Sequence, residues 1–212
     1  MSPHSPDERC PNHESHPQQT TPEDGRTPIT RRQFVVGATT AVTAGLAGCL
    51  NSGRNNDAPA PITIPTTATC DVCGMTITQQ PGPTAEIFYA DAQPNDHDNP
   101  ARFDSTWEAF QFDFQHDNWT REAFYVTDYS AVDYDIQTDG GQQLLSTHYE
   151  QEAFADATDI TYVVGSSVVG AMGEDLIGFS DRTDAQAFRE EYGGDLATFD
   201  DVTPSLISSF GM

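Results

Sequence analysis

A short segment around residue 40 divides this chain into a leader and a part that folds. Two adjacent arginines, Arg31 and Arg32, precede a run of small and apolar residues. The run, about 16 residues, is shorter than the ~20 that span a bilayer. This order is typical of a twin-arginine export signal. The run ends in Leu-Ala-Gly-Cys at Cys49, which resembles a lipobox, where the cysteine is lipidated and the chain is cut just before it. The alternative is an ordinary hydrophobic helix with a buried cysteine.

The sequence therefore predicts three segments. Residues 1–48 form a twin-arginine lipoprotein signal peptide with a long polar leader. Residues 49–69, rich in Asn, Gly, Pro, Ala and Thr, form a flexible tether after lipidated Cys49. Residues 70–212 form one domain of ordinary size. We expect export by the twin-arginine route and anchoring to the extracytoplasmic face of the cell membrane through the N-terminal lipid.

The charge of the chain indicates a protein that folds at high salt concentration. The sequence holds 33 Asp and Glu against 9 basic residues, all of them arginine, yet 36% of its residues are apolar. This combination favours a folded domain with an acid-coated surface, as in extreme halophiles. Molar salt shortens the Debye length to roughly 3 Å and screens the self-repulsion. Binding of nucleic acid or anionic lipid head groups through the surface is excluded because no basic patch exists, whereas cationic partners remain open.

Short apolar and aromatic runs predict the strands. They lie at 85–89, 124–127, 132–136, 161–164 and 176–179. Two helices interrupt them. The first begins at the capping residues Asp104 and Ser105 and carries Trp107, Phe110 and Phe114 at helical spacing, and the second covers 184–192, with Ala185 and Phe188 inward.

The two helices are preceded by similar residues. Phe103-Asp104-Ser105 leads to Ala109-Phe110, and Phe179-Ser180-Asp181 leads to Ala187-Phe188, with slightly different spacing. This echo indicates an internal duplication of a strand, helix, strand unit. The residues thus predict an α+β fold in which two similar halves form one small domain.

The motif that carries chemistry is Cys70-Asp71-Val72-Cys73-Gly74-Met75. The thiolate of Cys73 and the thioether of Met75 are soft, polarizable ligands, and this pairing favours Cu(I) over zinc or hard cations. Gly74 allows the backbone to fold the ligands together. Zinc would require four N or S donors, and the folded part has no second cysteine pair. Its histidines, His97, His116 and His148, are scattered along the sequence.

Three alternatives remain open for this motif. Cys70 and Cys73 can form a structural disulfide outside the cell. They can also act as a thioredoxin-like redox pair, but such a pair opens a helix, whereas residues 76–78 have the character of a strand. Met75 can simply fill the core.

Several motifs follow one another along the chain. They are the lipobox at Cys49, Cys70-Asp71-Val72-Cys73-Gly74-Met75, Pro81-Gly82-Pro83 before Ala85-Glu86-Ile87-Phe88, Phe103-Asp104, Tyr125-Val126-Thr127-Asp128-Tyr129, Tyr162-Val163-Val164-Gly165-Ser166 and Ala171-Met172-Gly173. In this combination and order they resemble the NosL family, the copper-binding lipoproteins that accompany nitrous oxide reductase.

The resemblance implies a ligand set and a fold. Cys73 and Met75 match the core Cu(I) ligands of the family, and Cys70 matches a position that is cysteine in only some members. Met172 lies in the family's Met-Gly turn as a candidate further ligand, with simple packing as its alternative. The implied fold is a pair of ββαβ-like halves. The implied partners are nitrous oxide reductase, which would receive copper during its maturation, and its maturation machinery.

The chain departs from bacterial members of the family in its leader of about thirty residues before the signal, its acidity and its missing lysines. None of these features touches the ligands, but they leave the identity of the receiving copper enzyme open. No Ser-His-Asp set, phosphate loop or recognisable pair of carboxylates is present, and we expect the acidic residues to be solvated surface. The sequence predicts a non-enzymatic metal carrier, or a metallochaperone. The alternatives are an extracellular thiol-disulfide oxidoreductase and an extracellular interaction module held by a disulfide.

Overall fold

The computed structural model describes residues 58–92, 94 and 97–210. Arg31, Arg32 and Cys49, with the predicted signal peptide and residues 49–57 of the predicted tether, lie outside the described residues. Within the described part, none of the helices is both long and apolar enough to cross a membrane.

The first half of the domain is a sheet covered by a helix. Its strands β1 (Ala85–Tyr89), β2 (Ala101–Phe103), β3 (Arg121–Thr127) and β6 (Phe154–Asp156) pair antiparallel in the order β2-β1-β3-β6. Helix α1 (Thr106–Gln115) connects β2 to β3. It starts where the Ser105 side chain accepts a hydrogen bond from the Glu108 amide, which satisfies an N–H that the helix leaves unpaired.

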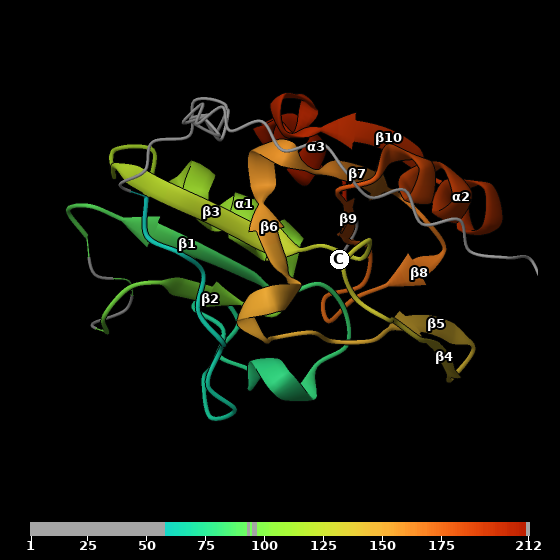
Figure 1. Ribbon diagram of the computed structural model, residues 1–212, viewed down its shortest axis with the longest axis horizontal. Coiled ribbons are helices and arrows are strands. Elements are labelled where there is room, and N and C mark those ends of the chain that lie inside the picture. Colours follow the sequence, from blue (N-terminus) through green and yellow to red (C-terminus); the bar gives the residue numbers. More distant parts are fainter. Residues whose placement is uncertain (1–57, 93, 95–96, 211–212) are drawn as a thin grey trace, which may run out of the picture. The chain divides into compact units, whose positions relative to one another are not determined.

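The second half repeats this arrangement. Strands β7 (Thr161–Val164), β9 (Leu176–Phe179) and β10 (Asp195–Thr198) pair antiparallel in the order β10-β7-β9, and helix α2 (Arg182–Tyr192) connects β9 to β10. In the first half β2 and β3 flank β1, and in the second half β9 and β10 flank β7, and in each half the helix lies between the two flanking strands in sequence (Figure 1). Strand β6 is an addition to the first half, next to β3. The predicted pair of ββαβ-like halves is confirmed.

Smaller elements complete the domain. The hairpin β4 (Ile136–Asp139) and β5 (Gln142–Leu145) extends through parallel pairing of β5 with β8 (Val168–Val169), and it projects at the edge of the molecule in Figure 1. Helix α3 (Pro204–Ile207) ends the described chain. The 3-10 helices are η1 (Ile77–Gln79), η3 (Gln151–Ala153), η4 (Ala157–Asp159) and η5 (Phe199–Asp201).

The duplication is closer than the sequence indicates. Ser105 and Asp181 are the two N-caps, so equivalent positions lie at a constant offset. Phe112 of α1 contacts Phe103 at a ring distance of 5.2 Å, and Phe188 of α2 contacts Phe179 at the same distance. The predicted match of Ala109-Phe110 with Ala187-Phe188 is therefore wrong. Ala109 and Phe112 correspond to Ala185 and Phe188, because burial follows the distance from the cap and not the adjacency of Ala and Phe.

Of the strands predicted at 85–89, 124–127, 132–136, 161–164 and 176–179, four are confirmed and the one at 132–136 is wrong. Residues 131–135 form turns and irregular chain, and β4 begins only at Ile136. Val132 and Tyr134 are half-buried against the second core cluster instead of pairing in a ladder. The second helix begins two residues before its predicted start, because the side chain of Asp181 caps it by accepting from the Thr183 amide.

The sheet of the second half separates two hydrophobic clusters. Tyr162 and Leu176 point into the first cluster, which also contains Phe103 and Phe110. Their sequence neighbours Val163 and Ile177 point into the second cluster, against α2. Side chains alternate between the faces of a strand, so these short apolar strands are buried on both faces.

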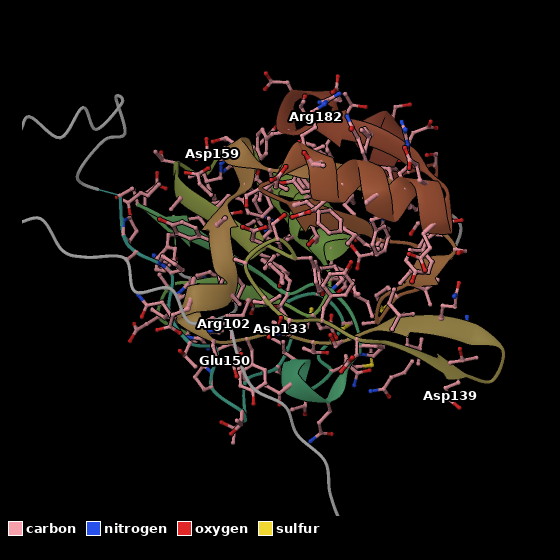
Figure 2. All side chains as sticks on the ribbon, turned by 45° about the vertical axis from the view of Figure 1, so that its right-hand side comes forward. Arg102, Asp133, Asp139, Glu150, Asp159 and Arg182 are labelled. Carbon is pink, nitrogen blue, oxygen red and sulfur yellow. The ribbon has the colours of Figure 1, made fainter. Side chains whose placement is uncertain are left out.

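Acidic side chains are spread over the surface, as expected. The exposed acids Asp133, Asp139, Glu150 and Asp159 lie on separate segments (Figure 2). The expectation is wrong for five buried ones among the described residues: Glu86, Asp104, Glu108, Asp128 and Asp175. Asp128 shows one reason, because its Oδ1 accepts from the amides of Ser130 and Ser180 and so ties the end of β3 to the end of β9.

Candidate metal centre

Residues 70–75, which we call the cysteine loop, form a tight turn. A β-bridge between Thr69 and Thr76 closes it, the Cys70 amide donates to the Met75 carbonyl at 2.8 Å, and the Gly74 amide donates to the Cys70 carbonyl at 3.0 Å. Gly74 has φ +74°, a conformation that costs other residues a steric penalty. The turn therefore needs this glycine, in agreement with its predicted role.

Backbone amides of the loop face the sulfur atoms. The Val72 amide lies 3.4 Å from Cys70 Sγ, the Cys73 amide also donates to Cys70, and the Met75 amide donates to Cys73. Hydrogen bonds to the charged form of a group favour that form. The turn is thus prepared to hold both cysteines as thiolates once a cation supplies compensating charge.

The segment after the loop differs from its prediction. The strand expected at 76–78 is wrong, because only Thr76 pairs and Ile77–Gln79 forms the 3-10 helix η1, which buries Ile77 completely. This helix has three residues and follows Met75, so the cysteines do not open an α-helix as a thioredoxin-like pair does. Cys70 and Cys73 are both free thiols in this structure.

Two carboxylates approach the thiols from the start of α1. Cys70 Sγ donates to Glu108 Oε2 at 2.9 Å, and Cys73 Sγ lies 3.5 Å from both oxygens of Asp104. One potential ligand atom from each of these four residues lies within 4.8 Å of the others. We call Cys70, Cys73, Asp104 and Glu108 the thiol-carboxylate cluster.

Neither carboxylate is predicted as a ligand from the sequence. Asp104 was assigned to helix capping, and Glu108 stands three residues after Ser105, the spacing of a capping box. Its carboxylate instead accepts from the thiol of Cys70. The structure distinguishes this helix start by its burial, since the first turn of α1 presents Thr106, Trp107 and Glu108 together to the interior.

The surroundings favour the protonated forms of three groups of the cluster, which are the two thiols and Glu108. Burial, reinforced by the charge of Asp104, raises the pKa of Cys70, and burial also raises the pKa of the less enclosed Cys73. Burial and the hydrogen bond to Asp104 raise the pKa of Glu108. A metal must therefore displace protons from the thiols as it binds.

The two methionines predicted as ligands lie in separate turns. Met75 is half-buried beside Cys73 in the loop. Met172 lies in a turn closed by a β-bridge between Gly170 and Gly173, and both Met172 and Cys73 pack as half-buried side chains against the first hydrophobic cluster. Asp175, three residues after Met172, accepts from the Trp107 amide in the first turn of α1. The Met172 turn is thereby linked to the helix that carries Glu108.

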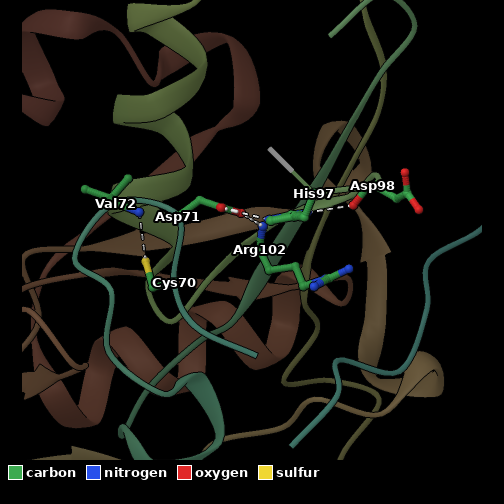
Figure 3. Close-up of polar contacts among 6 residues, drawn as sticks. All are labelled: Cys70, Asp71, Val72, His97, Asp98 and Arg102. Carbon is green, nitrogen blue, oxygen red and sulfur yellow. Dashed lines mark hydrogen bonds and ion pairs between the residues drawn. The ribbon is translucent and has the colours of Figure 1, made fainter. Parts of the chain in front are cut away.

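Asp71 fixes the cysteine loop to its surroundings (Figure 3). Its Oδ2 accepts from the Arg102 amide at 2.7 Å, its amide donates to the Arg102 carbonyl at 2.9 Å, and its Oδ1 lies 2.9 Å from His97 Nε2. The Asp71 side chain is 3% exposed. Strand β2 thus holds the loop through both the side chain and the backbone of Asp71. His97, which is distant in the sequence, contacts the loop through the Asp71 carboxylate.

Asp71→Ala is expected to lower the free energy of unfolding by about 1.5–3 kcal/mol, since it leaves the Arg102 amide without its charged acceptor. Most of this loss belongs to that amide, because His97 is 33% exposed and its ion pair is screened. Chemical denaturation in molar salt measures the change, with Asp133→Ala as an exposed control. Equal stability of the two variants contradicts the anchoring role of Asp71.

Comparisons with known proteins agree on one family. The family model NosL matches residues 61–207. The copper-binding lipoprotein NosL of Stutzerimonas stutzeri is 29% identical over 164 residues, which are 77% of this chain and 76% of that protein. The crystal structure of the copper chaperone NosL from Shewanella denitrificans matches with a TM-score of 0.53 and 33% identity, over 67% of this chain and 94% of that one.

Proposed function

Because this chain belongs to the NosL family, we propose that it is an exported, lipid-anchored metallochaperone that binds Cu(I) and delivers it to nitrous oxide reductase during maturation of that enzyme. The observation that carries the proposal is the convergence of two thiols on one turn whose amides face the sulfur atoms. Cys73 and Met75 are the core ligands in this proposal, and Cys70 and Met172 are the further ones. A thiolate and thioether set holds Cu(I) in preference to hard cations.

Exposure of the ligands suits transfer. Cys70 is 3% exposed, whereas Cys73 and Met75 are only half-buried. A receiving protein can reach Cys73 and Met75 first and replace one ligand at a time, while Cys70 still holds the ion. Stepwise exchange of this kind avoids releasing free copper.

The carboxylates raise a second candidate metal. Zinc was disfavoured from the sequence because the folded part has no second cysteine pair, but Asp104 and Glu108 add two carboxylate oxygens and bring the cluster to four potential ligands. Two thiolates and two carboxylate oxygens can form a tetrahedral zinc site. In that case the methionines have no role as ligands, so binding of the two metals responds differently to Met75→Ala.

Copper delivery is tested with the full chain loaded with Cu(I) and mixed anaerobically with copper-free nitrous oxide reductase. We expect copper to move to the enzyme and its activity to appear, and Cys73→Ser to support neither. The same copper supplied by a small-molecule complex is the control for unassisted loading. Activation at the same rate by that complex argues against delivery, even if the protein binds copper tightly.

The anchor is proposed at Cys49, on the Leu-Ala-Gly-Cys sequence behind Arg31 and Arg32. Mass spectrometry of the mature protein is expected to show a chain that begins at a lipid-modified Cys49. The double substitution Arg31→Lys with Arg32→Lys is expected to block export. A secreted product with an unmodified thiol at Cys49 removes the anchor, and normal export of the double variant removes the twin-arginine route.

A further inference from the structure

The duplicated halves place an acidic residue at the same point of each helix. Glu108 lies three residues after the N-cap Ser105, and Asp184 lies three residues after the N-cap Asp181. In the first half this position faces the cysteine loop. In the second half it borders a surface depression of about 280 Å³. The equivalent of the metal centre is therefore a pocket with different residues.

Aromatic rings form the floor of this depression, which we call the tyrosine pocket. Tyr129 and Phe188 are buried, and Tyr134 and Tyr192 are half-buried. The rings contact one another, with centroids 5.4 Å apart for Tyr129 and Tyr134, 6.3 Å for Tyr134 and Phe188, and 4.7 Å for Phe188 and Tyr192. Such a connected floor is rigid, because each ring is held by the next.

The rim of the tyrosine pocket is negative. Asp184 and Glu191 line it, and the negative charge of both carboxylates disfavours ionisation of Tyr134. Among the described residues that line the pocket, none carries a positive charge. Burial is the largest cause of the raised pKa of Tyr134, and these two charges add to it, so the ring of Tyr134 is neutral. Neutral aromatic rings and two carboxylates that line the same depression form a favourable environment for a cation.

We propose that the tyrosine pocket binds one organic cation, either an alkylammonium or a guanidinium group. Such a cation gains from the aromatic rings and the carboxylates at once. A transition metal finds no soft or imidazole donor there, and a strongly hydrated inorganic cation does not use aromatic faces. This site goes beyond copper carriage and does not depend on it.

The test uses tetramethylammonium as the probe, with the full chain in molar sodium chloride. Saturable shifts of the tyrosine ring signals in NMR spectra are expected, and none with tert-butanol, a neutral molecule of similar shape. Tyr134→Ala is expected to weaken binding about 5- to 30-fold, Asp184→Asn to weaken it a few-fold, and Tyr134→Phe to retain it because the ring remains. Asp133→Asn, an exposed acid outside the pocket lining, is the control.

Two further probes identify the source of the cation. Equal affinity for arginine amide and for a short arginine peptide with neutral flanks indicates recognition of the cationic group alone, as in a free solute. Tighter binding of the peptide indicates a basic side chain of a partner protein. Both results support the pocket. Absence of saturable binding for all three cations, or equal shifts with tert-butanol, overturns the proposal, and Tyr134→Phe guards against a fold lost in Tyr134→Ala.

Discussion

Cys73→Ser is expected to abolish tight Cu(I) binding. The substitution replaces a soft thiolate by a hard hydroxyl that stays protonated at neutral pH. It also removes the sulfur that accepts from the Met75 amide and lies 3.5 Å from Asp104. Serine fits the space of cysteine, and Cys73 is half-buried, so the fold is expected to survive. Competition with a chromogenic Cu(I) chelator under anaerobic, reducing conditions measures the loss.

Two substitutions in the same loop provide a comparison for the loss of Cu(I) affinity in Cys73→Ser. Met75→Ala is expected to weaken binding by about 10- to 100-fold, as disturbed metal shells do, since the thiolate remains. Cys70→Ser is the informative variant. A loss of affinity as large as that in Cys73→Ser indicates that Cys70 is a ligand. Near-normal Cu(I) binding indicates that Cys70 is only a disulfide partner of Cys73. Full affinity in Cys73→Ser contradicts the copper-carrier proposal, whatever the family resemblance implies.

Removal of salt is expected to unfold or strongly destabilise the domain. After Cys49 the sequence holds 28 Asp and Glu and five Arg. Their repulsion is screened within roughly 3 Å in molar salt but over ~30 Å at 0.01 M. Compact structure concentrates this charge, so low salt penalises the folded state more than the unfolded one.

Circular dichroism at a series of salt concentrations measures this effect. Between molar and ~0.01 M salt, we expect the melting temperature to fall by roughly 10 °C or more, which corresponds to about 3–5 kcal/mol for a chain of this size. Sucrose in place of salt separates screening from the general effect of an excluded solute. An unchanged melting temperature contradicts the halophilic interpretation of the composition.

Regular patterns made the main elements predictable. The strands at 161–164 and 176–179 match β7 and β9 residue for residue, because both are apolar runs buried on two faces. The helices followed from their capping residues and inward aromatics. Strands β2, β6 and β8 have three residues or fewer, too few to show a period. The polar hairpin β4 and β5 lacks the apolar alternation that a prediction needs.

The candidate site was predictable only in its local part. The cysteine loop and Gly74 follow from adjacent residues. Asp104 and Glu108 reach the site from the start of α1. In the sequence both residues are explained by capping of this helix, so no pattern indicates the contact between Glu108 and Cys70. His97 reaches Asp71 across 26 positions, and single-sequence patterns carry no information about such pairings. The ligand roles of the two cysteines and the two methionines, Cys70, Cys73, Met75 and Met172, all stay predictions.

The most direct test of the account is a competition between two metals for the reduced wild-type chain. Anaerobic titration with Cu(I) against a chromogenic chelator, in the presence of excess Zn²⁺, measures the number of ions held and the preference at once. We expect one Cu(I) per chain, which the protein retains against the chelator, and we expect Met75→Ala to weaken this binding. Tight Zn²⁺ binding that Cu(I) does not displace, and that Met75→Ala leaves unchanged, would contradict the copper-carrier proposal.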